Sequence, residues 1–276
     1  MEYAALYRMG VCKLQDAGIE EASLDARLLL EAVCGTDRNT LLAHGDREVT
    51  EEQCRCYVNY LDRRSRHIPL QHILGYQEFM GLRFKVSPAV LIPRQDTETL
   101  VEEAMRFLHD GMHILDMCTG SGCILLSLLK YSNDCVGIGC DLSADALKIA
   151  VENAAMLGIE ADFVESDLFE RISGKFELIV SNPPYIKSGV IPELMEEVRK
   201  HDPMMALDGG EDGLFFYRRI VAEAGRYLYP GGMLFLEIGY DQADEVSGLM
   251  QEAGYKDITV CKDLAGLDRV VYGRAE

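Results

Sequence analysis

The sequence predicts an α/β protein with a doubly wound, mostly parallel sheet, preceded by a small helical region. From residue 112 onward, short apolar runs alternate with amphipathic segments. This alternation is typical of a parallel sheet covered by helices on both faces. The first 73 or so residues show only helical periodicity. A chain of 276 residues with 48% hydrophobic content is long and apolar enough for one large domain or two modest ones.

Seven strands are expected in the second part of the chain, each a short run rich in apolar residues. The first five alternate with helices, so we predict that they are parallel, whereas the last two resemble an antiparallel pair. In chain order the expected strands cover residues 113–117, 135–140, 161–165, 176–180, 233–238, 256–261 and 269–272. The helices expected from this part of the sequence cover about residues 97–109, 123–129, 212–228 and 241–253, with one more beginning near residue 143.

Three segments are expected along the chain. Residues 1–73 form a helical domain, residues 74–93 a linker with a β-hairpin, and residues 94–276 the sheet domain. The two strands of the hairpin cover about residues 73–79 and 82–86, with the turn at Gly81. We interpret the helical domain as a recognition module for a macromolecular substrate, because the sheet domain has no other evident means of recognising one. A simple packing cap is the alternative.

Charge and cysteine usage exclude several classes of protein. The net charge of −19, spread along the chain, disfavours a broad grip on a nucleic-acid backbone. No apolar run approaches the ~20 residues that cross a bilayer, and no signal-peptide pattern opens the chain. The nine cysteines show no zinc-binding spacing and are predicted to be reduced thiols. We therefore expect a cytoplasmic protein without a metal, a membrane or a stable nucleic-acid partner.

The most informative stretch is Asn182-Pro183-Pro184-Tyr185, which directly follows the fourth predicted strand. Because prolines cannot donate to a sheet ladder, they end the strand at the edge where open α/β sheets bind ligands. The Asn182 side-chain oxygen and the Pro183 carbonyl can each accept one N–H bond from the same NH2 group, and the Tyr185 ring can cover a planar amide or base. The alternative is an ordinary turn that ends a strand.

The loop after the first predicted strand is Cys118-Thr119-Gly120-Ser121-Gly122. It lacks the third glycine of a dinucleotide fingerprint, and no Walker A loop occurs in the chain. The pocket is therefore adenosine-compatible but has no phosphate cradle. Asp141 ends the second strand, where it can bind both ribose hydroxyls, and Asp167 follows the third strand, where it can meet an adenine amino group. A sulfonium cofactor suits such an acidic pocket, although each Asp alone can also be read as a helix cap or a solvated loop end.

These motifs resemble those of the class I S-adenosylmethionine-dependent methyltransferases with a Rossmann-like fold, in the Asn-Pro-Pro-Tyr form that methylates amide or amine nitrogens. Nearly the whole chain, including the stretches 69–75, 79–84 and 91–98, is similar to the HemK/PrmC family. Those enzymes methylate the glutamine N5 of the Gly-Gly-Gln loop of class I peptide-chain release factors, and the resemblance implies a two-domain monomer. It also implies two sets of site residues. Cofactor contacts would come from Cys118, Thr119, Gly120, Ser121, Gly122, Asp141, Asp167, Leu168 and Asn182, and glutamine contacts from Asn182, Pro183, Pro184 and Tyr185.

The chain departs from the family pattern at two positions. Cys118 replaces the usual glycine, which costs on the order of 1 kcal/mol if the backbone there has a positive φ angle. Gln95 replaces the usual proline, which loosens the turn before Thr97. These departures concern cofactor affinity rather than the class of protein.

The expected reaction is direct displacement at the methyl carbon by the glutamine amide nitrogen, with Asn182, Pro183 and Tyr185 as the catalytic residues and S-adenosylhomocysteine as the product. Two alternatives stay open at this point. Adenine N6 presents the same NH2 geometry, so a DNA or RNA adenine methyltransferase is one. A non-catalytic adenosyl-binding module is the other. We also predict that residues 186–212 form a long irregular loop, mobile over the site.

Overall fold

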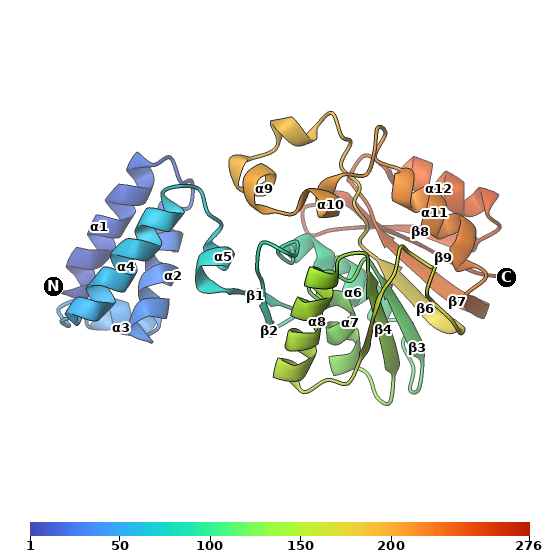
Figure 1. Ribbon diagram of the computed structural model, residues 1–276, viewed down its shortest axis with the longest axis horizontal. Coiled ribbons are helices and arrows are strands. Elements are labelled where there is room, and N and C mark those ends of the chain that lie inside the picture. The colour runs from blue at the N-terminus through green and yellow to red at the C-terminus, as the bar shows by residue number, and fades with distance from the viewer. The chain divides into compact units, whose positions relative to one another are not determined.

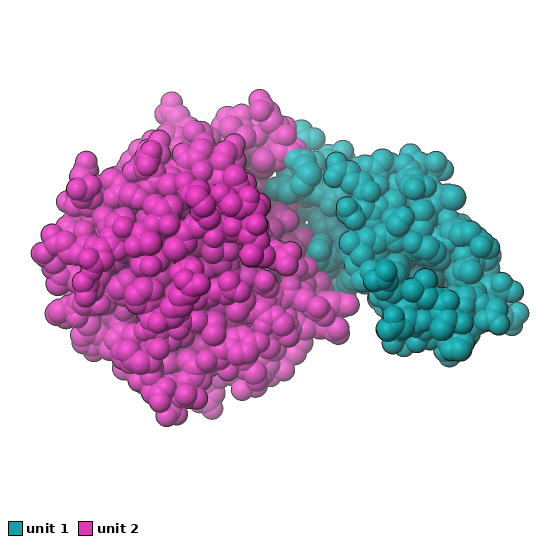
Figure 2. Space-filling model, turned by 180° about the vertical axis from the view of Figure 1, so that it is seen from behind, with its two compact units in different colours: residues 1–75, 195–201 teal, residues 76–194, 202–276 magenta.

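The computed structural model describes all residues, 1–276, and divides the chain into two compact units. Unit 1 consists of residues 1–75 and 195–201, and unit 2 of residues 76–194 and 202–276 (Figure 2). The helical unit therefore includes residues 195–201, a short segment that follows most of the sheet strands in sequence. None of the helices is both long and apolar enough to cross a membrane.

Unit 1 is built entirely of helices (Figure 1). Thr50 opens one of them with a full capping box, in which its hydroxyl accepts from the Gln53 N–H and the Gln53 side chain accepts from the Thr50 N–H. An apolar cluster that includes Leu6, Leu29 and Tyr57 fills the space between the helices. The helices are α1 (Tyr3–Asp16), α2 (Ala22–Cys34), α3 (Arg38–Ala43), α4 (Glu51–Arg64), α5 (Leu70–Leu74) and α9 (Glu196–His201).

Ion pairs of a buried arginine hold residues 195–201 within unit 1. The Arg64 guanidinium is almost fully buried and pairs with Asp25 through Nε at 2.6 Å and with Glu197 through Nη2 at 2.7 Å. Burial raises the pKa of Asp25, although Arg64 acts in the opposite direction. Because the Arg64 guanidinium is buried, losing these partners would leave a desolvated charge with fewer or no counter-ions, which is strongly destabilising.

Unit 2 contains a seven-stranded sheet with the order β5-β4-β3-β6-β7-β9-β8. The first five strands of this order are parallel, and β9 pairs antiparallel with both β7 and β8. This confirms the predicted fold class. The strands are β3 (His113–Met117), β4 (Val136–Asp141), β5 (Asp162–Glu165), β6 (Phe176–Ser181), β7 (Leu228–Glu237), β8 (Lys256–Lys262) and β9 (Asp268–Arg274).

Helices cover both faces of this sheet (Figure 1). Alternation along the strands separates two apolar clusters, since Ile114 belongs to one and Leu115 to the other. The cluster with Ile114 includes residues of α6 (Glu98–Met105), α7 (Cys123–Lys130) and α8 (Ala144–Leu157). The cluster with Leu115 includes residues of α11 (Phe215–Ala224) and α12 (Ala243–Glu252).

The hairpin before the sheet is shorter than predicted. It consists of β1 (Tyr76–Phe79) and β2 (Leu82–Lys85), because Ile73 and Leu74 end helix α5 instead. Met80 and Gly81 both have a positive φ angle, 50° and 71°, as a tight two-residue hairpin turn requires. The following helix is also shorter than the predicted 97–109, since a 3-10 turn, η1 (Gln95–Thr97), leads into α6 and that helix ends at Met105.

Two further predictions from the sequence are wrong. Strand β7 begins at Leu228, not at residue 233, because Tyr229 to Gly232 bulge out of it between the pairs Phe176–Leu228 and Leu178–Met233. A bulge admits Pro and Gly that a regular strand would not. Residues 186–212 are not irregular either, since they contain η2 (Ile191–Glu193), α9 and α10 (Met204–Leu207). Helices this short show no periodicity that a sequence pattern can reveal.

Candidate active site

The strand order reverses between β3 and β6, so the carboxyl ends of these neighbouring strands open a crevice. A cavity of about 510 Å³ lies at this edge, large enough for a nucleoside-sized ligand. Most of the predicted site residues line it: Cys118, Thr119, Gly120, Ser121, Asp141, Asp167, Leu168, Asn182 and Pro184. Gly122, Pro183 and Tyr185 do not line it.

The loop after β3 is held in an unusual backbone conformation. Cys118, Gly120 and Gly122 all have a positive φ angle, 61°, 55° and 79°. At Gly120 an added Cβ would meet no atom within 4 Å, whereas at Gly122 it would lie 3.3 Å from Ala150 of α8. Gly120 is therefore needed for its conformation, and Gly122 also for close helix packing. Cys118 adopts left-handed geometry that favours glycine, and its side chain faces the cavity.

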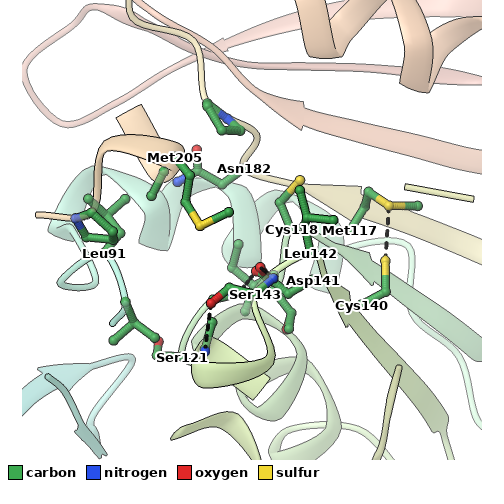
Figure 3. Close-up of a pocket in the computed structure, with 18 of the residues that line it drawn as sticks. Leu91, Met117, Cys118, Ser121, Cys140, Asp141, Leu142, Ser143, Asn182 and Met205 are labelled. Carbon is green, nitrogen blue, oxygen red and sulfur yellow. Dashed lines mark hydrogen bonds between the residues drawn. The ribbon is translucent and has the colours of Figure 1, made fainter. Parts of the chain in front are cut away.

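Asp141 joins the two loops of the cofactor side. Its Oδ2 accepts the Gly120 N–H at 2.9 Å, and its Oδ1 accepts the Ser143 N–H at the same distance. Burial raises the pKa of the carboxyl, which those two N–H groups partly offset. A carboxylate has about four acceptor positions, so each oxygen keeps one for a ligand hydroxyl. Figure 3 shows Asp141 beside Cys118, with Met205 reaching toward the same space.

Asp116 lies behind the loop and is completely buried. Its Oδ2 accepts the Thr119 hydroxyl at 2.6 Å, while its Oδ1 has no hydrogen-bond partner. Burial raises the pKa of this carboxyl to about 7. The acidic groups that reach the cavity wall therefore include Asp141 and Asp167, and an acidic wall fits a ligand that carries positive charge.

Leu168 and Asp167, two further predicted cofactor residues, differ in how much of each is available to contact a ligand. Leu168 has a positive φ angle of 50° and lines the cavity with its backbone held by a bond from the Ser166 hydroxyl at 2.7 Å. Asp167 also lines the cavity, but its Oδ1 accepts from Arg219 Nη1 at 2.8 Å. Only part of the Asp167 carboxylate is therefore available to an adenine amino group.

The acceptor side begins where β6 ends. Asn182 is half-buried, and its Nδ2 donates to the Thr97 hydroxyl oxygen at 3.3 Å. The side-chain oxygen is therefore directed away from Thr97. Pro183 and Pro184 are buried and fix the chain that carries Asn182. This arrangement leaves the Asn182 amide oxygen as an acceptor in the cavity wall.

Tyr185 is held by hydrogen bonds at both its side chain and its backbone. The hydroxyl donates to Glu237 Oε1 at 3.4 Å, and the backbone carbonyl accepts from Gln242 Nε2 at 3.1 Å. Burial raises the pKa of the Tyr185 hydroxyl, which therefore stays protonated at neutral pH. Gln242 is itself buried, donates a second bond to the Gly213 carbonyl and accepts from the Gly239 N–H. Every hydrogen-bonding group of the Gln242 amide is thus engaged around the Tyr185 turn.

Sequence reasoning did not identify Thr97, Glu237 or Gln242 as site residues. A signal for Glu237 was present, because a glutamate inside the apolar run 233–238 is unusual unless it is paired or functional. Thr97 and Gln242 carry no such signal. No cluster of three or more His, Cys, Asp or Glu side chains is arranged to hold a metal ion.

The segment after the Asn-Pro-Pro-Tyr motif covers one wall of the cavity. Its two ends lie side by side, because Ile186 bridges to Asp208 and its carbonyl accepts the Gly209 N–H at 2.8 Å. Met204 and Met205 line the cavity, and Arg94, which also lines it, pairs with the buried carboxylate of Asp202. A Cβ at Gly209 would lie 2.7 Å from the Tyr185 backbone, so this return of the chain depends on glycine.

Comparisons with known proteins agree with this geometry. The sequence-family model of the PrmC N-terminal domain matches residues 5–75 of this chain, and the family model of the methyltransferase small domain matches residues 95–211. The chain is 42% identical to the release factor glutamine methyltransferase of Agrobacterium fabrum over 94% of this chain and 92% of that one, and 44% identical to that of Geobacter sulfurreducens over 95% and 92%. Among solved structures, a methyltransferase of Pyrococcus furiosus has the same fold, with a TM-score of 0.55 at 18% identity, covering 70% of this chain and 89% of that one. The chain therefore belongs to the release factor glutamine methyltransferase family, a family of S-adenosylmethionine-dependent methyltransferases.

Proposed function

We propose that this protein transfers a methyl group to the side-chain amide nitrogen, N5, of the glutamine in the Gly-Gly-Gln motif of class I peptide-chain release factors. The observation that carries the proposal is the position of Asn182 in the wall of the same cavity as Cys118 and Asp141. The Asn182 NH2 is bound to Thr97, so its oxygen is free for a substrate donor. The names of the relatives supply the release factor as the substrate.

S-adenosylmethionine supplies an electrophilic methyl carbon when it is bound and leaves as S-adenosylhomocysteine. Cys118, Thr119, Gly120, Ser121 and Gly122 would shape the loop around it. Asp141 would accept ribose hydroxyl bonds, and Asp167, Leu168 and Asn182 would complete the wall. No metal ion is required by this chemistry.

The acceptor residues do their work by orientation. An amide nitrogen is a weak nucleophile because its lone pair is delocalised into the carbonyl. Asn182 Oδ1 and the Pro183 carbonyl would each accept one N–H of the glutamine NH2, and so would fix the nitrogen and increase its electron density. Pro184 and Tyr185 would line the path of the side chain. One N–H proton leaves the nitrogen during or after the transfer.

The whole protein is proposed to act as a cytoplasmic monomer with the division predicted from the sequence. Residues 1–73 would recognise the release factor, residues 74–93 would link the two domains, and residues 94–276 would catalyse the methyl transfer. The acidic surface, with a net charge of −19, supports a protein substrate over a stable nucleic-acid partner.

The direct test is Asn182→Ala with purified release factor and labelled cofactor. Turnover should fall more than tenfold while cofactor binding stays within about twofold, because the removed oxygen acts on the acceptor. Asn133→Ala is the matched control, since Asn133 is exposed and its side chain bonds only to Asp110. Unchanged turnover in Asn182→Ala, or label found on a release-factor side chain other than that glutamine, would refute the proposal.

A further inference from the structure

Gln242 lies where three segments of the sheet unit meet. It directly precedes α12, yet its side chain caps no backbone group of that helix. Only 4% of its surface is exposed. A residue just before a helix usually has a short side chain that bonds to the first turn, and a buried amide needs hydrogen-bond partners. The partners of the Gln242 side chain therefore lie outside the helix.

Three hydrogen bonds join the Gln242 amide to backbone groups. Its Nε2 donates to the Tyr185 carbonyl at 3.1 Å and to the Gly213 carbonyl at 3.2 Å. Its Oε1 accepts the Gly239 N–H at 2.9 Å. Because a backbone carbonyl only accepts and a backbone N–H only donates, the amide fits in a single orientation. The side chain thus joins the turn after β6, the segment before α11 and the residues that follow β7.

The glycines around the amide are a second, independent observation. A Cβ at Gly239 would lie 2.9 Å from Gln242 Oε1. A Cβ at Gly213 would lie 2.7 Å from Gln242 Nε2 and 2.5 Å from the Tyr185 carbonyl oxygen. These distances are too short for a carbon atom, so a side chain at either glycine would displace the amide. The backbone therefore leaves just enough room for a glutamine side chain at residue 242.

The segments that Gln242 joins supply part of the cavity wall. Asn182 and Pro184 line the cavity and come directly before Tyr185 in the chain. Asp208 and Phe216 also line it, on either side of Gly213 in sequence. Gln242 itself does not line the cavity. It can therefore act on a substrate only through the backbone groups that it holds.

We propose that Gln242 is a positioning residue for the methyl transfer, which holds the Tyr185 turn against the residues that follow β7. It thereby sets the place of Asn182 and Pro184 in the cavity wall, and the inference rests on the proposed function of these acceptor residues. The loop at residues 118–122 is held by Asp141 instead, through the Gly120 N–H. Loss of Gln242 should therefore affect the reaction much more than the binding of the cofactor.

The test uses the full-length protein and two substitutions that keep the length of the side chain. Gln242→Glu replaces the donor with an oxygen that faces two carbonyls, and Gln242→Met removes the bonds without adding charge. Each should lower kcat about tenfold or more, while the Kd for S-adenosylmethionine stays within about threefold of wild type by calorimetry. Gln251→Glu, at an exposed position of α12, makes the same change of charge and should leave both values unchanged.

Gly239→Ala displaces the amide without altering residue 242. Gly239 has no positive φ angle, so the added Cβ acts through its contact with Gln242 Oε1. This variant should also lower kcat, with the cofactor Kd unchanged. In the background of Asn182→Ala, Gln242→Met should lower kcat less than about threefold further, because the residue whose place it sets is gone. A side chain that only supports the fold would lower kcat by the same factor in both backgrounds.

The outcomes distinguish the inference from the proposed function. Normal turnover of Asn182→Ala would contradict the function proposed for Asn182. If Asn182→Ala is impaired, three results would each overturn the positioning role alone: wild-type kcat in both variants of Gln242, a cofactor Kd that rises in parallel with the loss of kcat, or equal losses of kcat with and without Asn182. Should both variants of Gln242 fail to fold, the kcat and cofactor Kd of Gly239→Ala decide in the same way.

Discussion

The cofactor side and the acceptor side of the cavity are built in different ways. On the cofactor side, each group follows its own strand, and the contacts of Asp141 join residues that are closer in sequence, with Ser143 2 residues later and Gly120 21 residues earlier. On the acceptor side, Asn182 depends on Thr97, 85 residues earlier, and Tyr185 on Gln242, 57 residues later. The first side is specified by short motifs, whereas the second exists only once distant elements have packed together.

The largest expected effect tests the cofactor side. Asp141→Ala removes the only carboxylate that bridges the two loops and would hold the ribose. Two bonds to a charged group, at roughly 1.5–3 kcal/mol each, predict a rise in the cofactor Kd of about a hundredfold or more. Calorimetry measures it, with Asp145→Ala, an exposed residue of α8 bonded to Lys148, as the control. A change of less than threefold would mean that the ribose binds elsewhere.

The next effect is a pH dependence that belongs to the acceptor side. Burial raises the pKa of Glu237 to about 7. Because the folded state holds a Glu237 proton that the unfolded chain releases at lower pH, the free energy of unfolding should fall as the pH rises through 7. The titratable and charged groups that act on Glu237 are Asp96, Cys123, Tyr185, Tyr217 and Arg269.

The melting temperature of wild type and of Glu237→Gln as a function of pH checks this assignment. The pKa of Asp116 is also raised to about 7 by burial, so the contribution of Glu237 is the difference between the two profiles. Identical pH dependence in the two proteins would show that Glu237 does not contribute to it.

The smallest effect concerns Cys118. The positive φ angle of 61° strains a residue that carries a Cβ, so the substitution Cys118→Gly relieves backbone strain. It also removes a side chain from the cavity wall. We expect a cofactor Kd that is unchanged or up to about fivefold lower by calorimetry. A large loss of affinity would indicate that the thiol itself contacts the cofactor.

The same contrast explains what the sequence could reveal. The parallel strands and the loop at residues 118–122 were predictable, because apolar runs, prolines and glycines determine the backbone conformation of residues close to them in sequence. Strand β7 was misjudged since Pro230 and the following glycines belong to a bulge that only pairing with β6 defines. Thr97 and Gln242 were missed for a related reason, as their importance comes from neighbours that lie far away along the chain.

The discontinuity of unit 1 limits how the protein can be divided. Residues 195–201 belong with the first 75 residues, although the chain enters and leaves them from the sheet unit. A fragment that begins at Tyr76 would carry Glu197 without its partner Arg64, and an isolated fragment that ends at Gly75 would leave that nearly buried arginine with one counter-ion fewer. Neither piece is a self-contained half, so swapping the helical region between relatives requires exchanging both stretches of sequence together.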